Sequence, residues 1–153
     1  MQPGDALPDL RLATTADPAL HLPSLAGNLA VVYFYPKDAT PGCTTEARDF
    51  AALHPEFAAL GARVIGVSRD SLASHARFRE RQQLPFELAS DTDEAACRAF
   101  DVIHEKTLYG RTSLGVVRST FLFGRDGRLL RAWRGVRVAG HAQAVLDACR
   151  EAA

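Results

Sequence analysis

Two strand-like runs flank one helical segment early in this chain, and this order leaves few folds open. "NLAVVYFY", residues 28–35, is a continuous β-branched and aromatic run ending before Pro36, and "ARVIGVS", residues 62–68, is a second such run. Runs of this kind are typical of strands buried on both faces. The segment between them is helical by the spacing of its apolar residues, which are Phe50, Leu53, Phe57 and Leu60. Strand, helix and strand in this order predict a right-handed crossover and a parallel strand pair.

The remaining segments extend this unit to a single α/β domain covering residues 1–153. Near the N-terminus, "DLRLA" and "LHLPS" predict a small hairpin. Later, "RSTFLFGRDGRLLRAWRGV" predicts two antiparallel strands joined at Asp126 and Gly127. Asp91 and Glu94 predict a capping box at the start of a helix. Three further helices are expected, at about 71–83, 92–101 and 140–151. Together these elements predict a central mixed sheet flanked by helices.

Composition argues against several classes of function. The chain has 18 basic and 18 acidic residues, so no overall positive field exists to bind nucleic acid or an anionic membrane. No apolar run resembles a membrane span or a signal peptide, and the cytoplasm is therefore the expected compartment. The three cysteines are far apart, which fits neither a disulfide-rich scaffold nor a zinc site. The histidines lack metal-binding spacing, and we expect surface or capping roles for His21, His54, His75, His104 and His141.

Cys43 lies between a Pro/Gly-rich turn and the expected start of the first helix, in the stretch "FYPKDATPGCTTEARDF". There, unpaired backbone N–H groups and the positive end of the helix dipole favour an anion. Helical projection places Cys43 on the same side as Phe50 and Phe57, so its sulfur is expected to lie in an inward pocket. Thr40 can donate its hydroxyl hydrogen toward that sulfur or toward a bound oxygen atom, while Pro36 stiffens the turn.

A lone cysteine is more often a small buried hydrophobe than a reactive group. This turn, however, follows the carboxyl end of a strand that is expected to be parallel, where α/β folds place their ligands. A thiol in such a position has both the electrostatic field and the access that reactivity requires. We therefore interpret Cys43 as a reactive thiolate.

The residues around Cys43 resemble the peroxiredoxin family. Pro36, Thr40 and Cys43 form its PxxxTxxC signature, and "YFYPKDATPGCTTEA" is similar to the subfamily called bacterioferritin comigratory protein, or Q-type peroxiredoxin. The resemblance continues through "GDALPDLRL", "VIGVSRDS", "YGRTSLGVVRSTFLFGRDGR" and "AWRGVRVAGHAQAVLDA". It implies a thioredoxin-like fold with an N-terminal addition, reduction of hydrogen peroxide and organic hydroperoxides, no metal or bound organic cofactor, and a monomer.

The resemblance also implies a role for each matching residue. Cys43 corresponds to the peroxidatic cysteine, whose thiolate attacks a peroxide oxygen and becomes a sulfenic acid. Thr40 would position the peroxide, and Pro36 would shield the sulfur from bulk water. Arg118, in "VVRSTF", corresponds to the active-site arginine, which would stabilise the thiolate and the charge on the leaving oxygen.

Glu46 lies on the same helical face as Cys43 and would by itself disfavour a thiolate. We hypothesise that Glu46 pairs with Arg118 and orients it. The alternative is that Glu46 complements the dipole at the start of the helix. Arg134, next to Trp133, is a candidate for a second cation in the pocket.

The sequence leaves more than one route by which oxidised Cys43 could be reduced to the thiol. Many Q-type members carry a resolving cysteine five residues after the peroxidatic one, where this chain has Arg48, and "SLASHARFRERQQL" contains no cysteine. Cys97 projects away from the apolar stripe of its expected helix, consistent with an accessible side chain, whereas Cys149 falls among core residues. We favour reduction by an external thiol, either glutathione with glutaredoxin or thioredoxin. An intramolecular disulfide with Cys97 or Cys149 stays open.

Two other classes of function are considered. A thiol–disulfide oxidoreductase is disfavoured because Glu46 occupies the position where a CxxC motif would supply its second cysteine. A peroxide sensor or holdase, in which oxidation of Cys43 changes a partner interface without efficient turnover, stays open.

Overall fold

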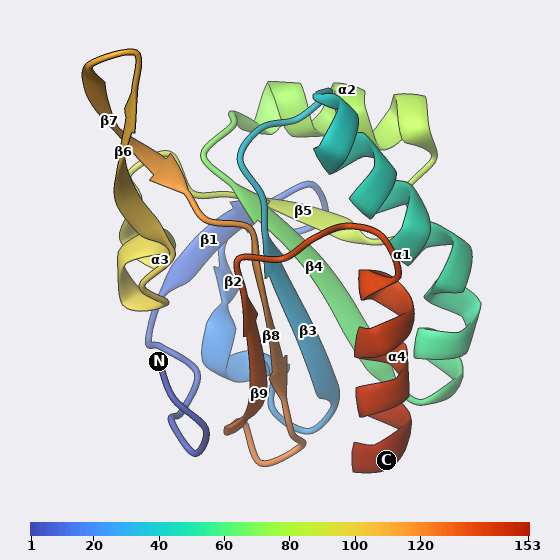
Figure 1. Cartoon of the computed structure of the whole chain (residues 1–153). Helices are drawn as coiled ribbons and strands as arrows, with labels where there is room; N and C mark the ends of the chain where they lie inside the picture. Colours follow the sequence, from blue (N-terminus) through green and yellow to red (C-terminus); the bar gives the residue numbers. More distant parts are fainter.

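A seven-stranded mixed sheet forms the centre of the protein (Figure 1). The computed structural model describes residues 1–153. In spatial order the strands are β2 (Leu20–His21), β1 (Arg11–Thr14), β5 (Glu87–Ser90), β4 (Ala62–Ser68), β3 (Leu29–Phe34), β8 (Ser119–Phe123) and β9 (Leu129–Arg134). Parallel pairing joins β3 to β4 and β4 to β5, and the other pairs are antiparallel. The predicted parallel pair, the mixed sheet and both predicted hairpins are confirmed.

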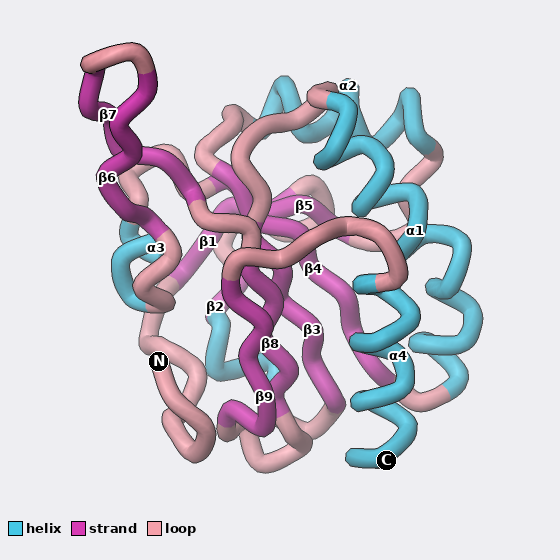
Figure 2. The backbone as a smooth tube through the Cα atoms, viewed as in Figure 1, coloured by secondary structure: helices cyan, strands magenta, loops and turns pink.

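Helices cover both faces of this sheet (Figures 1 and 2). One face carries α1 (Pro41–Ala59), α2 (Leu72–Gln82) and α4 (His141–Ala152). The other face is covered by the 3-10 helix η1 (Leu22–Leu25) and the short helix α3 (Ala95–Ala99). None of the helices combines the length and the apolar character that crossing a membrane requires.

β3 contributes side chains to two separate cores. All six of its residues are buried. Val31 and Tyr33 pack in the core beneath α1, α2 and α4. Val32 and Phe34 pack in the core on the opposite face. Successive side chains of a strand point to opposite faces, and burial on both sides explains why this segment is a continuous apolar run.

A second, two-stranded sheet was not predicted. It is a hairpin of β6 (Ile103–Leu108) and β7 (Arg111–Val116) that projects from the body of the protein (Figure 2). Tyr109 and Gly110 turn the chain with φ angles of 52° and 75°, as a tight hairpin turn requires. Most residues of both strands are exposed, so neither strand shows the apolar alternation by which a half-buried strand is recognised.

The start of α3 differs from its prediction. The helix is shorter than the predicted 92–101, and Glu94 precedes it in a left-handed conformation without capping it through its side chain. The carboxylate of Asp91 instead accepts hydrogen bonds from the backbone N–H groups of Ala96, at 2.9 Å, and Cys97, at 2.8 Å. The predicted capping box is therefore wrong, because a turn at residues 92–93 separates Asp91 from the helix and the side chain of Glu94 makes no capping hydrogen bond.

Candidate active site

Cys43 lies in the first turn of α1, just beyond the carboxyl end of β3. The helix begins at Pro41, with Thr40 at its N-cap position. The path of β3 continues through Tyr35, whose backbone N–H donates to the carbonyl oxygen of Val67 at 3.1 Å. The side chain of Cys43 is 2% exposed and belongs to the core beneath α1. The predicted position of Cys43, at a helix start and facing inward, is confirmed.

Arg118 reaches Cys43 from the strand beside β3. It directly precedes β8, and the pairing of Phe34 with Ser119 brings it to the end of β3. Its Nη2 donates to Cys43 Sγ at 3.4 Å, and its Nη1 donates to Glu46 Oε1 at 2.7 Å. One guanidinium therefore joins the sulfur and the carboxylate, and the expected pairing of Arg118 with Glu46 is confirmed. A charged donor aimed at the sulfur favours its anionic form.

Gly42 is a part of this arrangement that sequence reasoning missed. A Cβ atom at this position would lie 3.2 Å from Arg118 Nη2, which is a tight contact. The guanidinium therefore lies against the bare backbone of the first helical turn. The sign of this role in the sequence was the glycine directly before Cys43, since a side chain there would crowd any group that approaches the sulfur.

The two charged groups that flank Cys43 influence one another. Burial raises the pKa of Glu46 to about 7, although Arg118 acts to lower it. Burial opposes the charge on Arg118, but Glu46 and Cys43 outweigh this effect and raise the pKa of Arg118. Arg118 thus stays a cation, while Glu46 takes up a proton near neutral pH. Protonation of Glu46 removes a negative charge close to the sulfur.

Tyr33 was also missed as a neighbour of the site. It stacks on Phe50 with ring centroids 4.7 Å apart, and its hydroxyl is buried without a hydrogen-bond partner, as is Glu46 Oε2. Burial, then Glu46 and Cys43, raise the pKa of Tyr33, so its phenol stays neutral. Alternation along β3 places Tyr33 on the face that α1 covers, and this was the signal in the sequence.

Three other residues were predicted to take part in the pocket, namely Thr40, Pro36 and Arg134. Thr40 donates its hydroxyl to the carbonyl oxygen of Lys37, at 2.8 Å, rather than to the sulfur. Pro36 is partly buried in the same turn. Arg134 donates to the carbonyl oxygens of residues 1, 100 and 101 and stacks over Phe121, on the opposite side of the sheet. Arg134 as a second cation in the pocket is therefore wrong.

Two histidines are buried and do not cap a helix, contrary to the surface or capping roles expected of them. His75 is 0% exposed and His141 is 6% exposed. His141 Nε2 lies 2.8 Å from the hydroxyl of Thr120, and its ring lies edge-on to Phe50. Burial, with Arg118 adding to it, lowers the pKa of His141 to about 4, so its ring is neutral at pH 7. Its place at the start of an amphipathic helix was the only sign of burial in the sequence.

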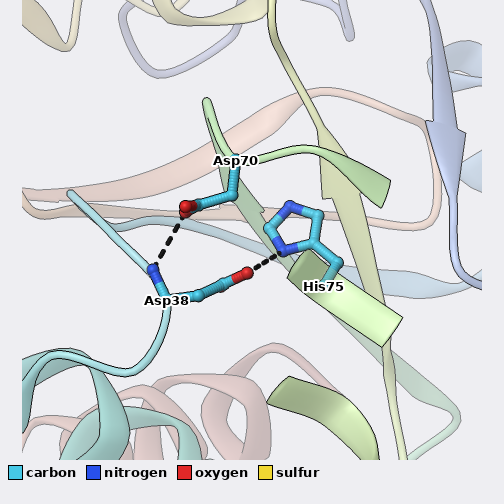
Figure 3. A group of neighbouring side chains, drawn as sticks. All are labelled: Asp38, Asp70 and His75. Carbon is cyan, nitrogen blue, oxygen red and sulfur yellow. Dashed lines mark hydrogen bonds and ion pairs between the residues drawn. The ribbon is translucent and has the colours of Figure 1, made fainter. Parts of the chain in front are cut away.

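One group of side chains has the composition of a metal site. Ligand atoms of Asp38, Asp70 and His75 all lie within 4.8 Å of one another (Figure 3). These atoms are already hydrogen-bonded: Asp38 accepts from the ring of His75, and Asp70 accepts from the backbone N–H of Asp38. A cation would have to displace both donors. The group is therefore better described as a hydrogen-bond network in which Asp38 and His75 are buried and Asp70 is partly exposed.

The two remaining cysteines are unpaired and fully buried. Cys97 lies in the core on the opposite face of the sheet from Cys43, so its expected accessibility is wrong. Cys97 shares the buried face of its helix with Ala96 and Phe100, whereas Arg98 and Ala99 form the exposed face. Burial, then Asp91, raises the pKa of Cys97, and burial raises the pKa of Cys149 to about 11. The core position predicted for Cys149 is confirmed.

The chain is similar to known proteins over nearly its whole length. A profile of the AhpC/TSA family matches residues 3–132. Peroxiredoxin Bcp of Xanthomonas campestris is 55% identical over 142 residues, which cover 93% of this chain and 89% of that protein. Peroxiredoxin Bcp of Bacillus subtilis is 43% identical over 148 residues, covering 97% and 94%.

Solved structures agree with these sequence relatives. The bacterioferritin comigratory protein of Xanthomonas campestris, studied for its alkyl peroxide reduction activity, superposes with a TM-score of 0.91 at 52% identity, covering 96% of this chain and 98% of that one. A variant of PrxQ from Xylella fastidiosa superposes with a TM-score of 0.93 at 43% identity, covering 99% and 96%.

Proposed function

Because this chain belongs to the AhpC/TSA family and is a peroxiredoxin, a thiol-dependent peroxidase, we propose that Cys43 is its peroxidatic residue. The observation that carries this proposal is the hydrogen bond from Arg118 Nη2 to Cys43 Sγ, at 3.4 Å, in the first turn of α1. A guanidinium and the oriented amides of a helix start both stabilise a negative sulfur. Neither Cys97 nor Cys149 has a comparable setting.

The proposed reaction is nucleophilic attack by sulfur. The Cys43 thiolate forms a bond to one peroxide oxygen while the O–O bond breaks, so the sulfur is oxidised by two electrons to a sulfenic acid. The other oxygen leaves with a proton from solvent, as water or an alcohol. Arg118 stabilises the charge as it moves from sulfur to the leaving oxygen. Glu46 orients the guanidinium, Thr40 positions the peroxide, and Pro36 shields the sulfur. Substrates are hydrogen peroxide and organic hydroperoxides.

An external thiol then restores Cys43. It condenses with the sulfenic acid to a mixed disulfide and water, and a second thiol releases the Cys43 thiol. Neither internal cysteine is placed for this task. Cys97 lies across the sheet. Cys149 precedes Arg150 in α4, and Arg150 donates a hydrogen bond to Glu56 of α1 at 2.7 Å. Glu56 is thirteen residues beyond Cys43 in α1, about 20 Å along the helix, whereas a disulfide needs Cα atoms within about 7 Å.

The partner and compartment follow from this cycle as parts of the proposal. The reductant is glutathione with glutaredoxin, or thioredoxin. Three unpaired cysteines fit a reducing compartment, for which the cytoplasm is the proposal. The protein acts as a monomer, which analytical ultracentrifugation of the reduced and oxidised forms would test.

Three cysteine variants test the assignment. Peroxide consumption is followed with dithiothreitol, glutathione–glutaredoxin and thioredoxin as alternative reductants. Cys43→Ser is expected to abolish turnover, whereas Cys97→Ser and Cys149→Ser are expected to retain it. Mass spectrometry after one equivalent of peroxide should find the added oxygen on Cys43. A disulfide between Cys43 and either other cysteine would contradict the external route.

A further inference from the structure

A cavity of about 360 Å³ lies between the turn that precedes α1, the start of α1 and one face of α2. The side chain of Cys43 belongs to the core and does not line this cavity, so the proposed peroxide reaction does not use it. The wall formed by α2 consists of residues 74, 77, 78, 81 and 82, which the helical period places on one side of the helix. A cavity of this volume has the size of a site for a small organic molecule rather than for a bare ion.

Two arginines of α2 line this cavity without an acidic partner. Arg77 and Arg81 are both exposed, and they are four residues apart on one helix, where like charges repel. The arginine ion pairs of the protein are made by other residues, namely Arg63, Arg69, Arg98, Arg118 and Arg150. The last turn of α2 gives Arg81 a favourable interaction with the helix dipole, but Arg77 lies before that turn. An anion between the two guanidinium groups would remove their repulsion.

Two further hydrogen-bond donors line the cavity, one from each helix. The hydroxyl of Thr44 and the side-chain amide of Gln82 are partly buried and make no hydrogen bond within the protein. Thr45, the next residue, instead donates its hydroxyl to the carbonyl oxygen of Pro41 at 3.1 Å. Because Thr44 belongs to the first turn of α1, an anion bound here would also lie near the positive end of that helix. The cavity therefore offers hydroxyl, amide and guanidinium donors that the fold itself does not use.

One carboxylate, that of Asp38, also borders the cavity. It is 6% exposed, and its oxygens are already hydrogen-bonded. Oδ1 accepts from the hydroxyl of Tyr35 at 2.6 Å, and Oδ2 accepts from Ser74 at 2.9 Å and from His75 Nδ1 at 2.7 Å (Figure 3). These donors compensate the charge of Asp38 inside the protein, whereas both guanidinium groups reach solvent. The accessible part of the cavity is therefore positive.

The donor set suits a phosphate group. A guanidinium binds phosphate oxygens through a planar fork of N–H groups, and two such forks match a group that carries up to two negative charges on three terminal oxygens. Phe78 is buried and forms an apolar part of the wall beside the two arginines, and Ala39 adds a second apolar part from the turn. The remaining volume of the cavity therefore suits the small organic part of a phosphate ester.

We propose that this cavity is a binding site for a small phosphate monoester, whose phosphate is held by Arg77 and Arg81 and hydrogen-bonded by Thr44 and Gln82. The site is separate from the peroxide pocket, and the proposal does not depend on the role of Cys43. Because both guanidinium groups contribute, loss of either one is expected to weaken binding about tenfold or more, as for the loss of one hydrogen bond between charged groups.

Isothermal titration calorimetry of the full-length reduced protein measures this binding at low ionic strength, where charge interactions are least screened. The probes are glycerol 3-phosphate, ribose 5-phosphate and AMP, and the comparison compounds are ribose, inorganic phosphate and citrate. At least one ester is expected to bind with a dissociation constant below about 1 mM, and about tenfold more tightly than inorganic phosphate or citrate. Ribose, which lacks the phosphate, should not bind.

Single arginine variants locate the site. Arg77→Gln and Arg81→Gln should each weaken binding of the tightest ester about tenfold or more, and the double variant should abolish it. Arg125→Gln removes an exposed arginine from the turn between β8 and β9, and as the matched control it should keep the wild-type affinity. Thermal unfolding should show Arg77→Gln to be at least as stable as wild type, because the repulsion between neighbouring arginines is lost. Weaker binding then does not reflect unfolding.

Three results would overturn the proposal: no binding of any ester, binding of inorganic phosphate or citrate as tight as that of the esters, or equal losses of affinity in Arg77→Gln and Arg125→Gln. Peroxide consumption by Arg77→Gln should equal that of wild type. Failure of the proposed peroxidase function would give a different result, because wild-type Cys43 would then resist peroxide while ester binding stayed unchanged.

Discussion

Replacing Glu46 by glutamine should change how the stability of the protein depends on pH. The pKa of Glu46 rises from its ordinary 4.5 to about 7, chiefly because of burial. The folded protein therefore binds a proton more tightly than the unfolded chain. The resulting stabilisation is complete below pH 4.5 and is lost as pH rises to about 7. At about 1.4 kcal/mol per pH unit, the shift of the Glu46 pKa from 4.5 to about 7 contributes roughly 3 kcal/mol to the free energy of unfolding.

Urea unfolding of wild type and Glu46→Gln between pH 4.5 and 8 measures this quantity. The wild-type curve alone is not sufficient, because the pKa of His141, lowered to about 4 by burial and Arg118, gives a dependence of opposite sign in the same range. The difference between the two proteins isolates Glu46. The free energy of unfolding of Glu46→Gln should gain roughly 3 kcal/mol relative to wild type from pH 4.5 to 8. Glu56→Gln, on the exposed side of α1, should show no such gain. A constant difference between wild type and Glu46→Gln would refute the reasoning.

Two further predictions concern the guanidinium. Arg118→Met should slow oxidation of Cys43 by peroxide about 100-fold or more, because a donor that stabilises the developing charge is lost. Stopped-flow measurement compares wild type, this variant and the exposed control Arg150→Met. An unchanged rate in Arg118→Met would exclude the proposed role of Arg118. Gly42→Ala places a Cβ 3.2 Å from Arg118 Nη2. This contact should slow oxidation of Cys43 about tenfold, which corresponds to a barrier increase of about 1.4 kcal/mol. Thermal stability should be equal or higher, because alanine favours a helix. A loss of stability without a loss of rate would contradict this account of the glycine.

The parts of the fold that sequence predicted well are those whose burial imposes a pattern. The runs at 28–35 and 62–68 became β3 and β4 because both faces of each strand are covered, which requires continuous apolar residues. The hairpin of β6 and β7 escaped prediction for the converse reason, since most of its side chains face solvent and only the residues at its base pack against the core. α3 was predicted too long because a short helix carries too few residues to establish a period.

The site was predictable only in part. Cys43 and Glu46 are three residues apart, and their shared helical face followed from the period of the helix. Arg118 lies far away in the sequence, and only its resemblance to a known motif placed it beside them. Tyr33 and His141 gave weaker signs, because their relation to Cys43 depends on how β3, α1 and α4 pack together. The accessibility expected of Cys97 was wrong because a helical projection does not reveal what covers the helix.

The amino-acid sequence by itself determined that a cysteine follows a buried strand at the start of a helix, because strand burial and helix initiation depend on neighbouring residues. Tertiary structure decided which groups surround that cysteine. Arg118 meets Cys43 because β8 pairs with β3, and Asp38 meets His75 because α2 packs beside the turn that precedes α1. These contacts join residues that are distant in the chain, and the free energy that holds them comes from sheet pairing and core packing, which no local pattern encodes.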